Sequence, residues 1–413
     1  MMVTCCQPGD GGVRATKSAT PSNDSPLDSL VQLAVQVTSL STISTTGDSL
    51  LRDTAALVFR QSVDLLRHHR ADLRIRQLDL FTTKKWFQHI TFKHFDLPSL
   101  ESASLNFWEN GELQRRIQQT AKGIHTLQLR YHPQDKLDWG ISNLPYLRDL
   151  TLWGSPWVNY KSRELQSILG GASHLVLLRL MSISISGDEH LSIPTLQSLR
   201  LVSTQVDCEL VSPRLHNIAM GLDSTFATGE PMDLTSLEIL TLEDCRLAEN
   251  LHIRAASLYA LTIQLSLANS GATMHELRNL LDRQTGAGFI SLRVLHLRVM
   301  FVHSIQLSQL LGQLSSLWDL ELSGFPLKKP FFEALTGSPL PNRSSNSDRG
   351  GTPICASLRL FDICLEGILQ TPTRKAMTKS ARMAVHERGK GKFPLTIAQI
   401  RTRKLDPWTS SLE

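Results

Sequence analysis

Residues 236–247 read SLEILTLEDCRL, and this stretch decides the fold. Its fixed positions follow the pattern L-x-x-L-x-L-x-x-C-x-L and are occupied by Leu237, Leu240, Leu242, Cys245 and Leu247. Leu240 and Leu242 are two residues apart, which is the spacing that places both side chains on one face of a β-strand. A lone short strand cannot bury such an apolar row, so this stretch requires similar strands beside it.

The same apolar triplet recurs along most of the chain. Triplets in one register open at residues 75, 100, 124, 147, 175, 196, 215, 237, 258, 292, 317 and 358. Nine of the eleven gaps between them lie within or next to the roughly 20 to 29 residues that are typical of leucine-rich repeats. The alternative, a leucine-rich globular core, requires all these triplets to fall into one register by chance. The sequence therefore predicts an α/β fold: a leucine-rich-repeat solenoid over residues 73–370, with a curved horseshoe shape, a parallel β-sheet on the concave side, and helices and turns outside.

The segments that flank and interrupt the repeats have a different composition. Residues 1–25 are rich in Gly, Ser, Thr and Pro and are predicted to be disordered. Residues 26–72 have helical periodicity and are predicted to form an N-terminal cap, a possible F-box remnant, that covers the first strand. Residues 336–353, TGSPLPNRSSNSDRGGTP, predict a mobile loop.

The length of each gap predicts what lies between successive strands. Helices are expected in four gaps, at GELQRRIQQTAKG, LRNLLDRQ, SIQLSQLLGQL and PFFEALTG. Between residues 175 and 258 the gaps are too short for a full helix, so turns and extended chain are expected there.

Residues 371–413 form a basic helix and tail. Thr371 and Pro372 suit a helix start, and Gly389 suits a helix end. Between residues 373 and 404, ten Lys or Arg residues against the single acid Glu387 give a charge of +9. The remainder of this +5 chain therefore carries −4. Such a helix could bind nucleic acid or an acidic partner, or serve as a solvated end cap. It lacks the interleaved aromatic residues that stack on bases, which favours the end cap.

Catalytic and metal-binding patterns are absent from the sequence. The six cysteines, at 5, 6, 208, 245, 355 and 364, form no C-x-x-C pair. Cys208, Cys245 and Cys364 fall in or beside repeat strands and are expected to be buried as small apolar groups. His296 and Glu321 fall on adjacent strands of the exposed face, where a surface contact is favoured over a catalytic pair. We therefore predict that the protein is not an enzyme and uses no cofactor and no metal.

The predicted concave face carries one concentrated binding surface. Arg130 and Trp153 occupy the position after the last leucine in consecutive triplets, and Asp149 lies next to Trp153. Arg179 and Arg200 stand in the neighbouring column of the next two triplets. A large aromatic side chain flanked by arginines is typical of a protein-binding hot spot. These five residues are predicted to bind an acidic, partly extended partner segment; the alternative is that Trp153 packs against a neighbouring loop.

The lead-in LLRHHRADLRIRQLDL and the repeats LPYLRDLTLWG, IPTLQSLRL and LTSLEILTLEDC resemble fungal F-box/leucine-rich-repeat proteins over roughly residues 50–370. The resemblance implies an N-terminal F-box that docks on the adaptor of a cullin–RING ubiquitin ligase, with the repeats holding the substrate. This chain departs from the F-box pattern. Its nearest stretch, SPLDSLVQLAVQV at 25–37, has no glutamate and no aromatic residue.

The leading functional prediction is a non-catalytic protein-interaction module, the substrate-recognition subunit of a cullin–RING ubiquitin ligase. Its expected partners are a protein substrate on the concave face and the ligase adaptor. One alternative is a nucleic-acid-associated protein that acts through the basic C-terminal segment, and another is a hydrolase with an unrecognised site. No apolar run approaches the roughly 20 residues of a membrane span, and no apolar signal segment opens the chain. Together with the unpaired cysteines, this predicts a cytoplasmic or nuclear protein without a membrane partner.

Overall fold

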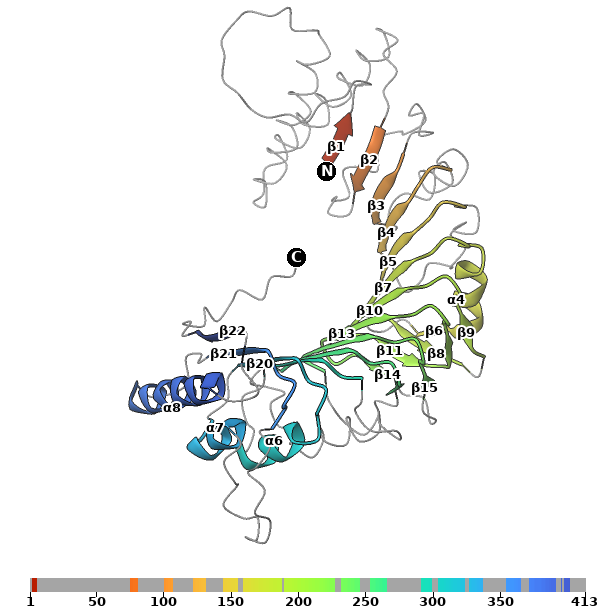
Figure 1. Ribbon diagram of the computed structural model, residues 1–413. Helices are drawn as coiled ribbons and strands as arrows, with labels where there is room; N and C mark the ends of the chain where they lie inside the picture. Colours follow the sequence, from red (N-terminus) through yellow and green to blue (C-terminus); the bar gives the residue numbers. More distant parts are fainter. Residues whose placement is uncertain are drawn as a thin grey trace, which may run out of the picture. The chain divides into compact units, whose positions relative to one another are not determined.

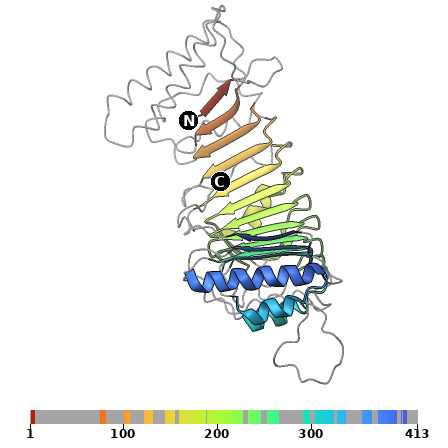
Figure 2. The same ribbon diagram turned by 60° about the vertical axis from the view of Figure 1, so that its left-hand side comes forward.

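A computed structural model describes residues 2–5, 75–80, 100–106, 122–130, 144–154, 159–187, 189–226, 232–245, 253–265, 291–298, 304–323, 327–336, 354–364, 371–390, 395 and 397–401. The chain divides into two compact units. Figures 1 and 2 show the strands and helices from which they are built. Unit 1 comprises Met1–Ile183 and Leu191–Thr195, and unit 2 comprises Ser184–His190 and Leu196–Glu413. Each unit is built mainly from short parallel strands with little helix, so the fold is a parallel β-solenoid.

The sheet strands of unit 1 pair in chain order. They are β1 (Met2–Cys5), β2 (Ile75–Leu80), β3 (Ser102–Asn106), β4 (Thr126–Arg130), β5 (Asp149–Trp153) and β7 (Leu177–Met181). All neighbouring pairs from β2 to β7 are parallel, whereas β1 is antiparallel to β2. Strand β1 lies in the segment for which composition predicts disorder. The residues MVTC include good strand formers, and the open edge of β2 offers backbone groups with which they pair.

Unit 2 repeats the arrangement with eight sheet strands in chain order. They are β10 (Ser198–Val202), β13 (Asn217–Gly221), β16 (Ile239–Glu243), β18 (Ala260–Gln264), β19 (Val294–Arg298), β20 (Asp319–Ser323), β21 (Leu360–Cys364) and β22 (Ile397–Arg401). Every neighbouring pair is parallel and in register, with one residue of each strand opposite one of the next. Strand β22 follows the basic helix, so the sheet continues past residue 370, where the sequence predicts the repeats to end.

Shorter strands lie between the sheet strands. They are β6 (Asn159–Lys161) and β9 (Leu191–Ser192) in unit 1, and β8 (Ser184–Ser186), β11 (Gln205–Asp207), β12 (Leu210–Val211), β14 (Thr225–Phe226), β15 (Met232–Asp233) and β17 (Ile253–Arg254) in unit 2. Within unit 2, β8, β11 and β14 pair in parallel, as do β15 and β17. The prediction of turns and extended chain between residues 175 and 258 is therefore confirmed for the residues described in this range.

Four helices lie in the described part of the chain: α4 (Ser162–Leu169), α6 (Ser304–Leu311), α7 (Lys329–Thr336) and α8 (Thr371–Lys390). The predictions of α6, α7 and α8 are confirmed, and α4 is a helix that the sequence did not suggest. In α4, the backbone N–H of Lys161 donates to Glu164 Oε2 at 3.3 Å, which satisfies one free donor at the helix start. Four further predictions, the helices at GELQRRIQQTAKG and LRNLLDRQ, the cap at 26–72 and most of the loop 336–353, lie outside the described residues.

The core is built from the alternating leucines. The side chains of Leu240, Leu242, Leu295, Leu297, Leu320 and Leu322 are at most 1% exposed, as the repeat register predicts. The residues between them point to the other side of the sheet, which we call the open face. In the five-residue sheet strands from β4 to β21, it carries the first, third and fifth residues. Any binding function of the sheet therefore depends on the chemistry of these open-face residues.

Candidate functional site

The open face of unit 1 brings Arg130 and Trp153 together, as predicted. They are register partners on β4 and β5, and the Arg130 guanidinium carbon lies 5.7 Å from the centre of the Trp153 ring. This distance is typical of a cation–π contact, which holds both side chains in place. Trp153 is half-buried and Arg130 is exposed, so the pair offers one apolar surface and one charge.

The other predicted residues are distributed more widely. Arg179 lies on β7, where its Nη1 donates to Thr151 Oγ1 on β5 at 3.4 Å. Asp149 is at the opposite end of β5 from Trp153, with Thr151 between them, so the prediction that it lies next to Trp153 is wrong. Four residues of strand separate their Cα atoms by about 13 Å. Arg200 belongs to unit 2, where it pairs with Ala219.

A glycine permits the close backbone approach that follows Trp153. The Gly154 N–H donates to the carbonyl of Met181 at 2.8 Å. A Cβ atom at position 154 would lie 2.7 Å from Ile183 Cγ1 and 2.9 Å from the Ser182 carbonyl oxygen. The chain leaving β5 thus packs directly on the chain leaving β7, which fixes the end of the strand that carries Trp153.

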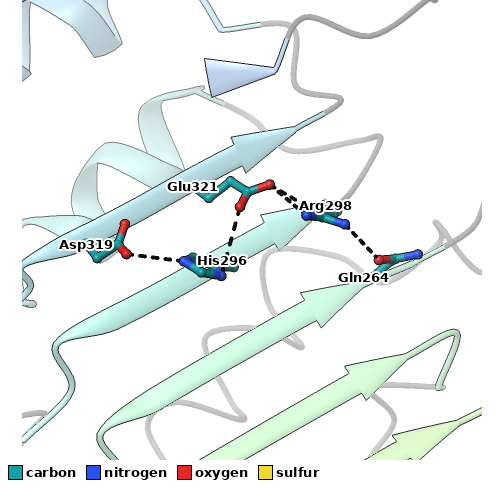
Figure 3. A network of polar contacts seen from close by, with 5 residues as sticks. All are labelled: Gln264, His296, Arg298, Asp319 and Glu321. Atoms are coloured by element: carbon teal, nitrogen blue, oxygen red, sulfur yellow. Dashed lines mark hydrogen bonds and ion pairs between the residues drawn. The ribbon is translucent and has the colours of Figure 1, made fainter. Parts of the chain in front are cut away.

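The open face of unit 2 carries a polar network that crosses three strands (Figure 3). Arg298 donates from Nε to Glu321 Oε1 at 3.1 Å and from Nη1 to Gln264 Oε1 at 3.4 Å. His296 Nε2 lies 3.5 Å from Asp319 Oδ2, and its Nδ1 lies 4.0 Å from Glu321 Oε2. Parallel register creates this network because it aligns His296 with Glu321 and Arg298 with both Gln264 and Ser323. The network holds these side chains in a fixed pattern of charge.

The network can be compared with a hydrolytic site that uses a Ser, Thr or Cys nucleophile. Such a site has a hydroxyl or thiol hydrogen-bonded to its base. Thr262 is the register partner of His296 on β18, yet no hydrogen bond joins these two side chains. Burial raises the pKa of Cys208 to about 11 and that of Cys245 and Cys355 to about 12, so these thiols remain protonated at neutral pH.

Helix α8 separates its basic residues onto two sides. Its buried side consists of Met377, Ala381, Ala384 and Arg388, and the helix packs on α7. Its exposed side carries five residues spaced three or four apart, which we call the basic stripe: Lys375, Lys379, Arg382, His386 and Lys390. Lys390 also pairs with Glu387 at 3.3 Å.

Arg388 anchors α8 through main-chain carbonyls. Its Nη2 donates to the carbonyl of Cys355 at 2.6 Å, and its Nη1 donates to the carbonyls of Leu335 and Ile354 at 3.3 and 3.2 Å. Burial lowers the pKa of Arg388, with a smaller contribution in the same direction from Arg359. The sequence assigned Arg388 to a solvated basic segment, but this residue is 4% exposed and acts as a structural anchor.

Among the described residues, no cluster of His, Cys, Asp or Glu has the geometry to hold a metal ion. No described helix combines the length and apolar character that crossing a membrane requires. Neither protein-family models nor curated proteins give a match to this sequence. The chain is therefore characterised by its own geometry: a parallel β-solenoid with an aromatic–arginine pair on the open face of unit 1 and a charged network on that of unit 2.

Proposed function

We propose that the protein is a leucine-rich-repeat protein whose sheet binds a protein partner without catalysing a reaction. The repeat assignment is supported by the residues at the position that Cys245 occupies in the quoted stretch. Thr204 stands at the matching place after β10, Ser224 follows one residue later than the matching place after β13, and all three side chains are at most 1% exposed. Ser224 Oγ accepts from the Thr204 N–H at 3.2 Å and donates to the Gly221 carbonyl at 2.5 Å. Buried polar side chains that satisfy the turn after each strand are what a repeat of this type requires.

The observation that carries the binding proposal is the Arg130–Trp153 pair. Tryptophan and arginine dominate protein-binding hot spots, because the ring contributes desolvated area and the guanidinium binds carboxylates in a fixed geometry. Both side chains project from rigid, register-paired strands, so little conformational entropy is lost when a partner binds. Arg179, held by Thr151, extends the positive character to the next strand. This arrangement favours an acidic partner segment.

In its most specific form, the proposal is a substrate-recognition subunit of a cullin–RING ubiquitin ligase in which a curved sheet holds the substrate. The resemblance to F-box/leucine-rich-repeat proteins supports this form, while the segment 26–72, which would carry an F-box, lies outside the described residues. Co-purification of the tagged full chain with the ligase adaptor tests it directly. If the adaptor does not co-purify while another protein binds through Trp153, the interaction module stands and the ligase role is wrong.

A second candidate function is nucleic-acid binding through the basic stripe of α8. Its support is the alignment of Lys375, Lys379, Arg382 and His386 on one exposed helix side. Phosphate binding of this kind weakens steeply as salt rises. Titration of a labelled RNA duplex at increasing salt, with wild type and a Lys375→Gln/Lys379→Gln/Arg382→Gln variant, tests this candidate. Equal affinities for the two proteins would contradict it.

A further inference from the structure

The residues that immediately precede five strands of unit 2 form a second row, beside the open face. They are Glu238, Tyr259, Arg293, Trp318 and Arg359, and we call them the edge row. From Tyr259 onward, each backbone N–H of this row donates to the carbonyl of the preceding member, at 2.7, 2.9, 2.8 and 2.8 Å. Consecutive members therefore lie about 4.8 Å apart, and the two aromatic residues about 10 Å apart.

The aromatic members of the edge row are unusually exposed. Tyr259 is 46% exposed and Trp318 is 49% exposed, because Leu258 and Leu317 just before them fill the core instead. Arg293, between them in the row, is also exposed. The neighbouring column of the open face begins with Ile239, Ala260 and Val294, which are register partners, and Ile239 is 38% exposed. Apolar surface is thus continuous from the edge row onto the sheet.

The charged residues around the edge row indicate which class of partner can bind to it. Alternating aromatic and arginine side chains suit either a protein hot spot or a single-stranded nucleic acid. Asp319 directly follows Trp318, and Glu321 and Asp362 are register partners on the adjoining open face. Glu321 already pairs with Arg298 at 3.0 Å, whereas Asp319 adjoins the row and would repel a phosphate backbone that runs along it. A protein segment can direct single carboxylates toward the arginines and avoid the acidic side.

We propose that the edge row from Tyr259 to Arg359 is a second protein-docking surface. It receives a partner segment whose aromatic or aliphatic side chains pack against Tyr259 and Trp318 and whose carboxylate pairs with Arg293. Asp319 sets the orientation by excluding further partner acids from the open-face side. This inference rests on the proposed protein-binding function, but it assigns a different surface, in unit 2, from the Arg130–Trp153 pair in unit 1.

A phage-displayed library of random linear peptides, selected on the full chain, supplies a probe for this surface. The selected peptides are expected to combine acidic with aromatic or aliphatic residues. Fluorescence anisotropy of a labelled synthetic copy should show at least about a tenfold loss of affinity with Tyr259→Ala, Trp318→Ala or Arg293→Glu. Tyr146→Ala is the matched control, because Tyr146 is 57% exposed but lies in unit 1. Changing the peptide's acidic residue to lysine should restore binding to the Arg293→Glu protein, which separates loss of contact from loss of fold.

The remaining outcomes each overturn the inference in a recognisable way. If the peptide binds the edge-row variants as tightly as the wild type but binds the Trp153→Ala variant more weakly, the proposed function stands and the second docking surface is wrong. Binding of single-stranded oligouridine that weakens with Trp318→Ala would show that the row recognises nucleic acid. If no peptide binds the chain at all, the proposed protein-binding function fails and this inference fails with it.

Discussion

Thr204, Ser224 and Cys245 show how single buried side chains stabilise the turns that follow the leucine-rich strands. The leucines fill the core between strands, but the turn after each strand still contains backbone groups that must find partners away from water. Ser224 supplies both a donor and an acceptor at that place, so one hydroxyl joins its own turn to the preceding one. The buried polar column is therefore part of the stacking, and not a defect in the core.

Replacing Ser224 by alanine should lower the free energy of unfolding by about 1 to 3 kcal/mol, because the buried Thr204 N–H loses its acceptor. Urea denaturation followed by circular dichroism measures this change. Thr235→Ala, in an exposed turn of the same unit, is the control and should change stability by less than about 0.5 kcal/mol. Equal effects of the two substitutions would contradict the role given to Ser224.

Leu240→Ala should cost about 2 to 5 kcal/mol, since Leu240 is fully buried and its removal leaves a cavity between stacked strands. Chemical denaturation is again the measurement. Ile239→Ala, one residue earlier and 38% exposed, should cost much less. A loss well below 1 kcal/mol for Leu240→Ala would show that the register is wrong.

The buried thiols predict sensitivity to alkali. Burial raises the pKa of Cys245 from 9.0 to about 12, so between these values the thiol ionises only in the unfolded chain. The unfolded state then binds fewer protons than the folded state, and stability falls with rising pH by about 1.4 kcal/mol per unit for each such thiol. Urea denaturation under reducing conditions from about pH 9 to about pH 11 should show this slope, reduced by that amount in Cys245→Ala. Below pH 9 the stabilising contribution is fully present, so the two proteins should show the same dependence of stability on pH there. A different dependence in that range would argue against this explanation.

At the scale of the elements, α8 illustrates how a basic helix becomes part of the fold. Three small or flexible apolar residues of α8 are buried, the helix packs on α7, and Arg388 reaches the backbone near Cys355. An arginine suits this place because its planar group donates to several carbonyls at once and keeps its charge even when burial lowers its pKa. The helix is thereby secured before the chain returns to the sheet as β22.

Arg388→Met should lower the free energy of unfolding by about 1.5 to 3 kcal/mol, because the carbonyls of Leu335, Ile354 and Cys355 lose a charged donor. Hydrogen exchange should show faster exchange of α8 amides than in the wild type. Arg382→Met, on the exposed side of the same helix, provides the matched comparison and should leave exchange unchanged. If both variants exchange alike, Arg388 does not anchor the helix.

The elements differ in how well the sequence predicts them. Strong leucine spacing predicted the strands, the apolar pattern predicted α6 and α7, and start and end signals at Thr371, Pro372 and Gly389 predicted α8. Helix α4 was missed because its short KSRELQSIL stretch has few apolar residues, and tertiary contacts support it: Gln166 exchanges two hydrogen bonds with the backbone of Ser192. Strand β22 was missed because it lies within a basic segment and its triplet, Leu395, Ala398 and Ile400, contains only one leucine.

At the scale of the whole molecule, strand register controls which distant residues can act together. Alternation predicted which side chains reach the open face and placed Arg130 beside Trp153. It did not predict that Arg388 is buried. Every residue has a main-chain carbonyl, so the partners of Arg388 cannot be recognised from their side chains in the sequence. Nor did it show the edge row, because Tyr259 and Trp318 occupy variable positions whose exposure depends on how the adjoining leucines pack.

The binding proposal makes its own prediction about Trp153. Trp153→Ala should weaken partner binding by at least about 2 kcal/mol while leaving the melting temperature nearly unchanged, because the ring is half-buried on a surface. Quantitative affinity purification followed by calorimetry with the purified partner measures both, and Tyr146→Ala serves as the control. Normal binding, or unfolding of the variant, would show that Trp153 is a packing residue.

The anchoring of α8 also has an evolutionary consequence. Arg388 contacts carbonyl oxygens, which every amino acid possesses, so the positions that accept its hydrogen bonds can drift without breaking them. Ile354 and Ala356 are only partly buried and are therefore open to substitution, whereas Leu335 and Cys355 are constrained by their burial. Selection to keep this contact therefore acts mainly on position 388. Related chains should conserve an arginine here even where the residues around it have changed beyond recognition.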